Sequence, residues 1–216
     1  MITGATGMVG EGVLLECLAN PEVSEVLIVN RKHYEAAHPK LKELLVPDFF
    51  DLSKFTGLLA GYDACFFCAG VSSAGMKEAD YTRVTYDLTL SFAQTLATIN
   101  PNMIFTYVSG ASTDSTEQGK TMWARVKGRT ENALLKLPFK KVYNFRPGAM
   151  KPTDGQKSIK PFYKVILFLF PLIKAIFPNS TSTVRAVGLA MINSVLKGYD
   201  KGILEVKDIK GLAGIE

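Results

Sequence analysis

Residues 1–12, MITGATGMVGEG, contain the pattern that decides the fold. Gly4, Gly7 and Gly10 recur at every third residue between a short apolar run and a stretch of helical periodicity. In a strand–turn–helix unit such glycines allow a tight turn, a close approach of the backbone to a pyrophosphate, and close packing of the helix on the sheet. The amides and the dipole at the start of the helix would then bind phosphate. The segment therefore predicts a dinucleotide-binding loop.

The surroundings of these glycines favour this interpretation over glycines that serve packing alone. A second strand ends near Asn30, at about the distance where a ribose-binding residue belongs. Arg31 and Lys32 follow it, so this strand end has cations and no carboxylate. A carboxylate would bind the ribose 2′-hydroxyl of NAD, whereas cations suit a 2′-phosphate, so we expect NADP rather than NAD. The alternative is that Arg31 and Lys32 lie in a solvated loop without a ligand.

Further along the chain, apolar runs alternate with longer stretches of helical periodicity. The apolar runs predict strands at residues 25–30, 45–47, 63–70, 102–110 and 141–148. The periodic stretches predict helices at about residues 8–20, 40–45, 51–59, 77–98, 120–137 and 184–196, the last one capped by Thr183. Continuous apolar runs are typical of parallel strands that are covered on both faces.

These repeated strand–helix units predict an α/β fold. Right-handed crossovers place helices on both faces of the sheet, so we expect a single doubly wound parallel-sheet Rossmann-type domain over residues 1–216. A chain of 216 residues is long enough for one such domain and too short for two. We expect residues 150–182, approximately, to form a small C-terminal helical region on the substrate side, as a lid or insert.

The charge distribution narrows the class of partners. Residues 1–119 hold 7 Lys and Arg against 14 Asp and Glu, whereas residues 120–216 hold 18 against 6. The basic second part favours an anionic partner, such as a phosphorylated cofactor, an acidic substrate or a membrane surface. Its basic residues are dispersed among apolar ones, so we expect a small-molecule substrate and no nucleic acid. The sequence leaves the oligomeric state open.

Cysteine and histidine usage favours a reducing compartment and no metal. Cys17, Cys65 and Cys68 lie in apolar surroundings and are too few for a disulfide framework, so we expect a cytoplasmic location. Cys65 and Cys68 would face opposite sides of one strand, which argues against a redox pair. His33 and His38 have no neighbours at metal-site spacing, so we expect no metal site.

A series of short segments carries a family resemblance. In order they are GATGMVG at 4–10, DF at 48–49, FFCAGVSSAG at 66–75, the helix with Tyr81, Arg83, Tyr86 and Asp87, YVSGAS at 107–112, WARVKGRTE at 123–131 and NFRPG at 144–148. This series resembles the atypical short-chain dehydrogenase/reductases, in particular the branch of Tat-interacting oxidoreductase-like proteins, over most of the chain. The resemblance implies NADP binding and oxidoreductase activity.

The resemblance also implies a role for each matching segment. The glycine loop would bind the diphosphate, Arg31 the 2′-phosphate, and the pair at 48–49 the adenine. Residues 68–70 would run under the adenosine ribose, Lys127 would bind the nicotinamide ribose, and residues 146–148 would line the nicotinamide ring. With Asn30, the expected cofactor contacts are Gly4, Thr6, Gly7, Met8, Val9, Gly10, Asn30, Arg31, Asp48, Phe49, Cys68, Ala69, Gly70, Lys127, Arg146, Pro147 and Gly148.

The catalytic position departs from the family pattern. The family's acid–base tyrosine precedes the lysine by four residues on the same helical face, and here that position is Trp123. An indole N–H donates a hydrogen bond but cannot shuttle a proton near neutral pH, so Trp123 cannot be the general acid. The partner hydroxyl is Ser109 or Ser112, unless the register falls on Ala111. Lys127, Ser109, Ser112 and Trp123 are therefore the candidate catalytic residues.

Three accounts of Trp123 stay open. In the first, the protein binds NADP without ordinary carbonyl reduction. In the second, Tyr81, Tyr86 or Tyr143 transfers the proton, or the acceptor is a quinone-like or flavin-like molecule that needs no strong acid. In the third, Trp123 only packs and the site lies elsewhere. We expect an oxidoreductase acting on a small or lipophilic carbonyl or quinone-type substrate, and the alternative is a non-catalytic NADP-binding redox sensor or regulatory protein.

Residues 160–177, KPFYKVILFLFPLIKAIF, form the most apolar segment of the chain. Lys164, Pro171 and Lys174 interrupt it, and its longest apolar run is shorter than the roughly 20 residues that cross a bilayer. We expect a broken helix that covers the substrate pocket. The alternative is peripheral membrane contact through residues 161–177.

The first strand is short for its expected central place in the sheet. Only Met1, Ile2 and Thr3 are available, whereas such strands normally have about five or six residues. The missing ladder would cost several kcal/mol, at about 1 kcal/mol per hydrogen bond. We therefore expect the natural chain to have residues upstream of Met1.

Overall fold

A computed structural model describes residues 1–158, 170, 176 and 180–215. The strands are β1 (Ile2–Thr3), β2 (Val26–Asn30), β3 (Leu41–Leu45), β4 (Ala64–Phe67), β5 (Ile104–Val108), β6 (Lys141–Arg146), β7 (Ala149–Lys151), β8 (Thr181–Thr183) and β9 (Ile203–Glu205). The helices are α1 (Met8–Ala19), α2 (Thr56–Leu59), α3 (Glu78–Thr82), α4 (Leu88–Ile99), α5 (Met122–Leu134), α7 (Val184–Leu196) and α8 (Val206–Ala213), with a 3₁₀ turn η1 (Ser53–Phe55) and a π turn η2 (Arg83–Asp87). The apolar helix predicted at 161–177 lies outside the described residues.

The central sheet has seven strands in the order β3-β2-β1-β4-β5-β6-β9, and every pair is parallel. The order runs outward in both directions from β1, which pairs Ile2 with Ile28 on one side and with Phe66 on the other. This order is that of the doubly wound Rossmann fold, so the predicted fold class is confirmed. Ligands of such sheets bind beyond the carboxyl ends of the strands, where the order reverses.

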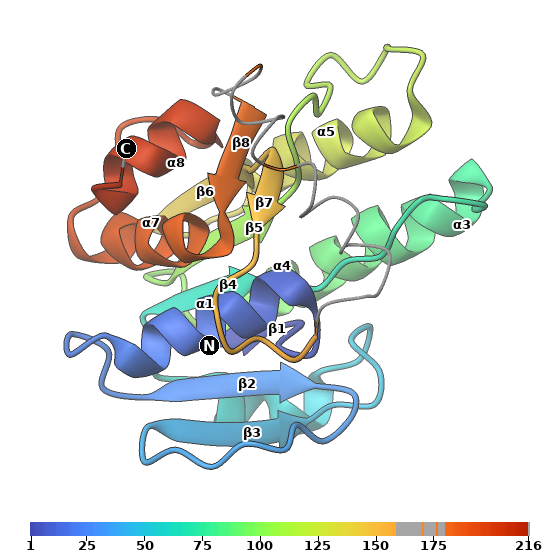
Figure 1. Cartoon of the computed structure of the whole chain (residues 1–216). Helices are drawn as coiled ribbons and strands as arrows, with labels where there is room; N and C mark the ends of the chain where they lie inside the picture. Colours follow the sequence, from blue (N-terminus) through green and yellow to red (C-terminus); the bar gives the residue numbers. More distant parts are fainter. Residues whose placement is uncertain (159–169, 171–175, 177–179, 216) are drawn as a thin grey trace.

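Helices cover both faces of the sheet (Figure 1). One apolar cluster joins α1, α7 and α8 to the sheet, and includes Val13, Ala190 and Ile209. The other joins α2, α4 and α5 to the opposite face, and includes Leu59 and Phe92. Burial on both faces explains why β2 is apolar from Val26 to Val29.

Two predictions about the third strand are wrong. Residues 40–45 are not a helix and residues 45–47 are not the strand, because Leu41–Leu45 forms β3 itself. Lys, Glu and Leu favour helices locally, but all five residues of this segment pair with β2. Leu41 and Leu44 are also half-buried, and this packing outweighs the local preference.

Other element predictions are confirmed. Thr183 caps α7, where its side-chain oxygen accepts a hydrogen bond from the amide of Ala186 at 2.9 Å. Cys65 packs in the α4 cluster while Cys68 packs against the α1 cluster, so the two thiols face opposite sides of β4. The helix predicted at 77–98 is one helical stretch in which the π turn η2 separates α3 from α4.

The amino edge of the sheet is hollowed beneath β1. Both neighbouring strands extend beyond β1 in this direction, since β2 begins at Val26 and β4 at Ala64. A cavity of about 390 Å³ lies beneath β1, between the starts of β2 and β4, and is lined in part by Met1, Val26 and Ile192. The Met1 amine donates a hydrogen bond to the carbonyl oxygen of Ala64 at 2.6 Å. This cavity therefore lies at the opposite edge from the glycine loop.

After β6 the chain turns into a small second sheet. β7 and β8 pair in parallel, with Met150 opposite Ser182. The turn requires Gly148, because a Cβ atom there would lie 1.9 Å from the carbonyl oxygen of Ser180. Within the described ranges, no helix is long and apolar enough to cross a membrane.

Candidate functional site

The glycine loop joins the end of the central strand β1 to the start of α1. Gly4 has a φ of +71°, and a Cβ atom there would lie 2.7 Å from the amide nitrogen of Ala69 at the end of β4. A Cβ atom at Gly10 would lie 2.1 Å from the carbonyl oxygen of Gly4. Gly4 and Gly10 are therefore required by the fold itself. They bring the helix, the loop and the end of β4 together.

Gly7 differs from the other two glycines. A Cβ atom there would meet only the carbonyl oxygen of Gly4, at the ordinary contact distance of 3.4 Å, and the residue is exposed. Nothing that the structure describes around this residue requires glycine. Gly7 is also the N-cap of α1 and provides no side-chain cap to the amides of the first turn. An exposed glycine before uncapped amides leaves room for a diphosphate, so the loop fits the predicted ligand.

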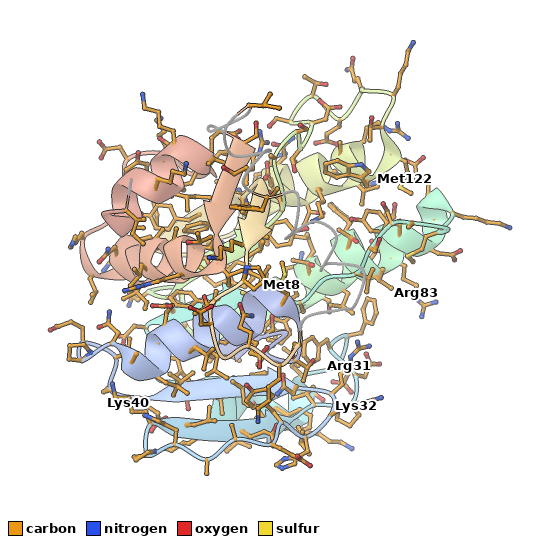
Figure 2. All side chains as sticks on the ribbon, viewed as in Figure 1. Met8, Arg31, Lys32, Lys40, Arg83 and Met122 are labelled. Carbon is orange, nitrogen blue, oxygen red and sulfur yellow. The ribbon has the colours of Figure 1, made fainter. Side chains whose placement is uncertain are left out.

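Figure 2 shows Arg31 and Lys32 at one end of β2 and Lys40 at the other, with Met8 at the start of α1. Arg31 and Lys32 are exposed at the carboxyl edge of the sheet, on the same side as the glycine loop. Asn30 is buried, and its side-chain amide donates a hydrogen bond to Glu43 at 3.3 Å. The side chains of Arg31 and Lys32 thus face solvent at the strand end for which the sequence predicts a 2′-phosphate contact.

Sequence reasoning missed Glu43, which supplies a carboxylate beside the end of β2. Glu43 lies on β3 and accepts hydrogen bonds from Asn30, from the amide of Tyr34 at 2.8 Å and from the ring of His33. Burial raises the pKa of Glu43, but these hydrogen bonds outweigh burial and leave the pKa below its usual value. The sequence does not reveal that Glu43 lies beside β2, because its local pattern predicts a helix at residues 40–45. In strand geometry the register Ile28–Glu43 places this carboxylate next to β2.

The predicted adenine and ribose contacts lie at two neighbouring strand ends. Cys68 and Ala69 are half-buried and Gly70 is exposed at the end of β4, where the amide of Ala69 donates to the Thr3 hydroxyl at 3.2 Å. Asp48 is exposed after β3. The ring of Phe49 is buried, 5.2 Å from that of Phe92 between centroids. An adenine contact by Phe49 would therefore come from its backbone.

Trp123 and Lys127 share one face of α5, and this face lies against the loop after β5. The Lys127 ammonium donates a hydrogen bond to the carbonyl oxygen of Ser109. The Trp123 ring lies 4.0 Å from the position of a Cβ atom at Gly110. Burial lowers the pKa of Lys127 to about 8, although the Glu131 carboxylate opposes the shift. The structure thus brings Trp123, Lys127 and the end of β5 together.

The two candidate serines have different surroundings. The Ser109 hydroxyl is buried and donates to the Glu131 carboxylate at 2.5 Å, with the carbonyl oxygen of Phe145 at 3.1 Å. Its hydrogen is therefore already bound within the protein. Ser112 is exposed and has a φ of +65°, a left-handed conformation that is uncommon for serine. Of these two hydroxyl groups only that of Ser112 is open to a ligand.

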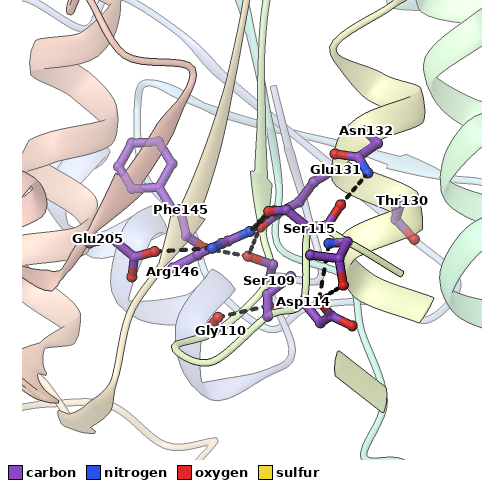
Figure 3. Close-up of polar contacts among 12 residues, drawn as sticks. Ser109, Gly110, Asp114, Ser115, Thr130, Glu131, Asn132, Phe145, Arg146 and Glu205 are labelled. Carbon is purple, nitrogen blue, oxygen red and sulfur yellow. Dashed lines mark hydrogen bonds and ion pairs between the residues drawn. The ribbon is translucent and has the colours of Figure 1, made fainter. Parts of the chain in front are cut away.

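Figure 3 shows a buried ion-pair network behind this loop, which sequence reasoning did not find. Glu131 is 0% exposed, and its carboxylate contacts the Arg146 guanidinium at 2.5 Å and 3.0 Å. Arg146 also contacts Glu205 at 3.1 Å and the Ser115 hydroxyl at 2.6 Å. Its side chain therefore joins α5, β9 and the loop after β5. A role for residues 146–148 at the nicotinamide would use their backbone.

The loop after β5 packs closely on α5. A Cβ atom at Gly128 would lie 1.8 Å from the carbonyl oxygen of Asp114, so only glycine permits this approach. The Asp114 carboxylate in turn accepts hydrogen bonds from the amides of Thr116 and Gly119 at 3.0 and 2.6 Å. Pro147 is buried, and its carbonyl oxygen accepts the amide of Ala111 at 3.0 Å, which ties this loop to the end of β6.

The tyrosines considered as alternative proton donors are engaged elsewhere. The Tyr143 hydroxyl accepts the amide of Tyr199 at 2.8 Å, at the start of β6 rather than at the carboxyl edge. The ring of Tyr86 lies under the Arg129 guanidinium at 4.2 Å, in a hollow between α4 and α5. Tyr81 is buried, and burial raises its pKa. Among the described residues no three His, Cys, Asp or Glu side chains form a metal-binding group.

The glycine loop, the two strand ends and the Trp123–Lys127 face define a Rossmann protein of the short-chain dehydrogenase type. A model of the NAD dependent epimerase/dehydratase family matches residues 1–130, which include all three features. The chain therefore belongs to the NAD dependent epimerase/dehydratase family.

Relatives among curated proteins agree with this assignment. Protein HTATIP2 of Rattus norvegicus is 28% identical over 160 residues, which are 73% of this chain and 64% of that protein. Protein fmp52, mitochondrial, of Emericella nidulans is 27% identical over 154 residues, 68% of this chain and 64% of the relative. The match thus spans slightly less than two thirds of each relative. It confirms the resemblance to the Tat-interacting oxidoreductase-like branch.

Solved structures of low sequence identity share the fold. MoeE5 in complex with UDP-glucuronic acid and NAD superposes with a TM-score of 0.68 at 16% identity, covering 99% of this chain and 80% of that one. The ADP-L-glycero-D-manno-heptose-6-epimerase of Helicobacter pylori gives a TM-score of 0.68 at 16% identity, covering 99% and 82%. These structural similarities support the Rossmann-type fold. They do not indicate a substrate for this chain.

The buried ion pair yields a stability prediction. In Arg146→Met the Glu131 carboxylate is left buried without its cation, so we expect the free energy of unfolding to fall by about 3–5 kcal/mol. The double variant Arg146→Met/Glu131→Leu should recover most of this loss, because it removes the stranded charge. Urea unfolding of the ligand-free protein measures both effects.

Arg125→Met is the matched control. Arg125 lies on α5, as Glu131 does, and contacts the more exposed Glu78 of α3 at 2.7 Å. Its removal should therefore lower the free energy of unfolding by less than about 1 kcal/mol. Equal losses for Arg146→Met and Arg125→Met would show that the buried network does not stabilise the fold.

The lowered pKa of Lys127 yields a pH prediction. Between pH 8 and the ordinary lysine value the unfolded chain holds this proton more tightly than the folded protein, so the parent gains stability as pH rises through this window. The stability of Lys127→Met relative to the parent should therefore fall by roughly 2–3 kcal/mol from pH 7 to 10.5. Urea unfolding at both pH values measures the difference. The exposed Lys54→Met controls for the loss of one positive charge, and equal behaviour of both variants would contradict the prediction.

Proposed function

We propose that the protein is an NADP-dependent oxidoreductase of the atypical short-chain type, acting on a small or lipophilic carbonyl or quinone-type substrate, with quinone-type acceptors preferred. The observation that carries the proposal is the common face of Trp123 and Lys127, which lies against the end of β5 at the carboxyl edge of the sheet. The glycine loop opens at the same edge. Cofactor and substrate would therefore meet beside Lys127.

The cofactor would be held by the chain's own groups in three places. The amides of the first turn of α1, with the exposed Gly7, would bind the diphosphate. Arg31, with help from Lys32, would bind the phosphate on the adenosine ribose. The Lys127 amine would bind the nicotinamide ribose. It already donates to the Ser109 carbonyl oxygen, so it has further donors for a ribose hydroxyl.

The surroundings of Glu43 support NADP over NAD. A free carboxylate beside the end of β2 would favour the 2′-hydroxyl of NAD and would repel a 2′-phosphate. Glu43 is a carboxylate close to this strand end, and it already accepts hydrogen bonds from Asn30, His33 and Tyr34. These donors offset its charge and leave the exposed Arg31 as the group offered to the ligand.

The identity of residue 123 supports a quinone-type acceptor. Bound NADPH supplies a hydride. The Trp123 indole can donate a hydrogen bond to the oxygen of an acceptor, but it cannot give up its proton near neutral pH. A reduced quinone leaves as a delocalised, weakly basic anion that takes its proton from water, whereas a reduced ketone leaves as a strongly basic alkoxide. The site can therefore stabilise the first product with hydrogen bonds alone.

The cofactor assignment predicts a measurable preference. We expect calorimetric titration to show at least tenfold tighter binding of NADP than of NAD, about 1.4 kcal/mol, because the 2′-phosphate pairs with Arg31. Arg31→Ala should lose this preference while NAD affinity stays the same. Lys42→Ala is the control, since it removes a cation on β3 that pairs with Glu25, the residue before β2. An unchanged preference in Arg31→Ala would exclude this residue as the phosphate contact.

The proposed chemistry predicts how Trp123→Tyr changes substrate preference. Stopped-flow oxidation of NADPH by the parent should be faster with quinones than with aldehydes or ketones. In Trp123→Tyr a general acid is restored, so the carbonyl rate should rise by about 100-fold, within the usual range for a positioned acid. The quinone rate should change little, because that reaction needs no acid.

Trp123→Phe separates the two roles of the side chain. It removes the indole donor without adding an acid, so it should slow quinone reduction and leave carbonyl reduction negligible. If the parent binds NADPH tightly but oxidises it with neither class, the proposed activity is wrong. That result would favour the non-catalytic redox sensor or regulatory protein.

A further inference from the structure

A short segment after β7 crosses the outer face of α1 (Figure 1). We call residues 152–158 the strap. The Gln156 side chain holds it to α1 by donating to the carbonyl oxygen of Met8 at 2.5 Å, and it accepts the amide of Thr153 within the strap at 2.6 Å. Glu11 accepts hydrogen bonds from the amides of the last two strap residues, Lys157 and Ser158. The strap therefore binds the first turns of the helix that begins at the glycine loop.

Glu11 is a buried carboxylate without a cationic partner in the described part of the chain. It is 2% exposed. Its oxygens accept the amide of Lys157 at 2.9 and 3.1 Å and the amide of Ser158 at 2.8 Å, with the Tyr34 hydroxyl at 3.5 Å. A buried carboxylate is costly unless it is well hydrogen-bonded. Most of the compensation here comes from backbone amides of the strap.

The position of Glu11 links it to the cofactor site. It lies on the first turn of α1, whose amides would bind the diphosphate, and so it places a negative charge close to the predicted position of an anion. An unscreened carboxylate there would repel the diphosphate. The strap amides of Lys157 and Ser158 point their positive ends at this carboxylate and offset its charge. Tyr34 extends the contact to the loop that carries Arg31.

We propose that Glu11 is a positioning residue that holds the strap closed on α1, and that strap closure and dinucleotide binding favour one another. The closed strap offsets the Glu11 charge and fixes the first turn of α1, so the closed state binds the diphosphate more tightly than the open state. Linkage then requires bound dinucleotide to keep the strap closed. This proposal rests on the proposed NADP-binding function and adds the coupling of that site to the segment after β7.

Limited proteolysis with trypsin measures strap opening. Lys157 is exposed, while its own amide is hydrogen-bonded to Glu11, so cleavage after Lys157 requires the strap to open. Mass spectrometry identifies the fragment that ends at this residue. The rate is expressed relative to cleavage after the exposed Lys140, which corrects for a general loss of stability. Calorimetric titration of NADP gives the affinity of each variant.

Two variants test the coupling from its two sides. In Glu11→Gln the charge is lost, and in Gln156→Ala the contact with Met8 is lost while α1 keeps its sequence. In both, we expect relative cleavage after Lys157 to be about tenfold faster. NADP affinity should be weaker in Gln156→Ala, which keeps the Glu11 charge but loses a contact of the strap, and should fall less in Glu11→Gln, because the repelling charge is itself removed. In the parent, saturating NADP should slow the same cleavage. The loss of affinity in a variant should not exceed this protection factor, because the coupling is reciprocal.

Glu16→Gln is the matched control. Glu16 lies on the same helix, 3.9 Å from Arg185 on α7 and away from the strap contacts, so neither the cleavage nor the affinity should change. If Glu11→Gln and Gln156→Ala leave cleavage after Lys157 unchanged, the strap is not held by these contacts and the proposal fails. If saturating NADP does not slow cleavage after Lys157 in the parent, the coupling is wrong. If the parent binds no NADP, the proposed function fails with the coupling, whereas the hold of Glu11 on the strap is still judged by cleavage alone.

Discussion

The rest of the structure depends on a close approach of backbone to backbone at the switch point of the sheet. The Gly4 backbone lies so near to Gly10 and to the end of β4 that a side chain at Gly4 or Gly10 would overlap main-chain atoms. This contact places the start of α1 over the first and fourth strands. The loop after β2, the strap and the face of α5 are then arranged around the same edge. Overpacking at such a point cannot be relieved by a side-chain rotation, because the crowded atoms are backbone.

Two buried carboxylates organise this edge in different ways. Glu131 is neutralised by the Arg146 guanidinium and joins α5 to β9 and to the loop after β5. Glu11 is held by backbone amides of the strap. A buried ion pair with several further hydrogen bonds is costly to open, because an unpaired charge would remain inside. If the strap opens, its amides and the Glu11 carboxylate are hydrated together, and no unpaired charge stays buried. Opening the α1 side of the site therefore costs less free energy than opening the Glu131–Arg146 side.

The fold could be predicted from the sequence more completely than the site. Parallel strands buried on both faces have continuous apolar runs, and the glycine spacing marks the switch point, so β1, β2, β4, β5 and β6 could be predicted from local patterns. The edge strand β9 and the helix α8 were not predicted. The segment 40–45 failed because its residues favour a helix, and only pairing with β2 makes it a strand. That error hid Glu43. Glu11, Glu131 and the hydroxyl orientation of Ser109 depend on contacts between residues far apart in sequence, which no local pattern records.

The replacement at residue 123 is consistent with the other features of the α5 face. In the family pattern the residue at this position is an acid–base tyrosine, and an indole cannot take that role near neutral pH. Lys127 is nevertheless kept at the end of β5, where it donates to the Ser109 carbonyl oxygen, and a ribose contact needs only a donor and not a full charge. Burial lowers the pKa of Lys127 to about 8, and the amine is a hydrogen-bond donor in both protonation states. Under the proposed function, the site keeps a hydrogen-bond donor for the cofactor and has no tyrosine acid at residue 123. This combination suits an acceptor whose reduced form carries its own charge.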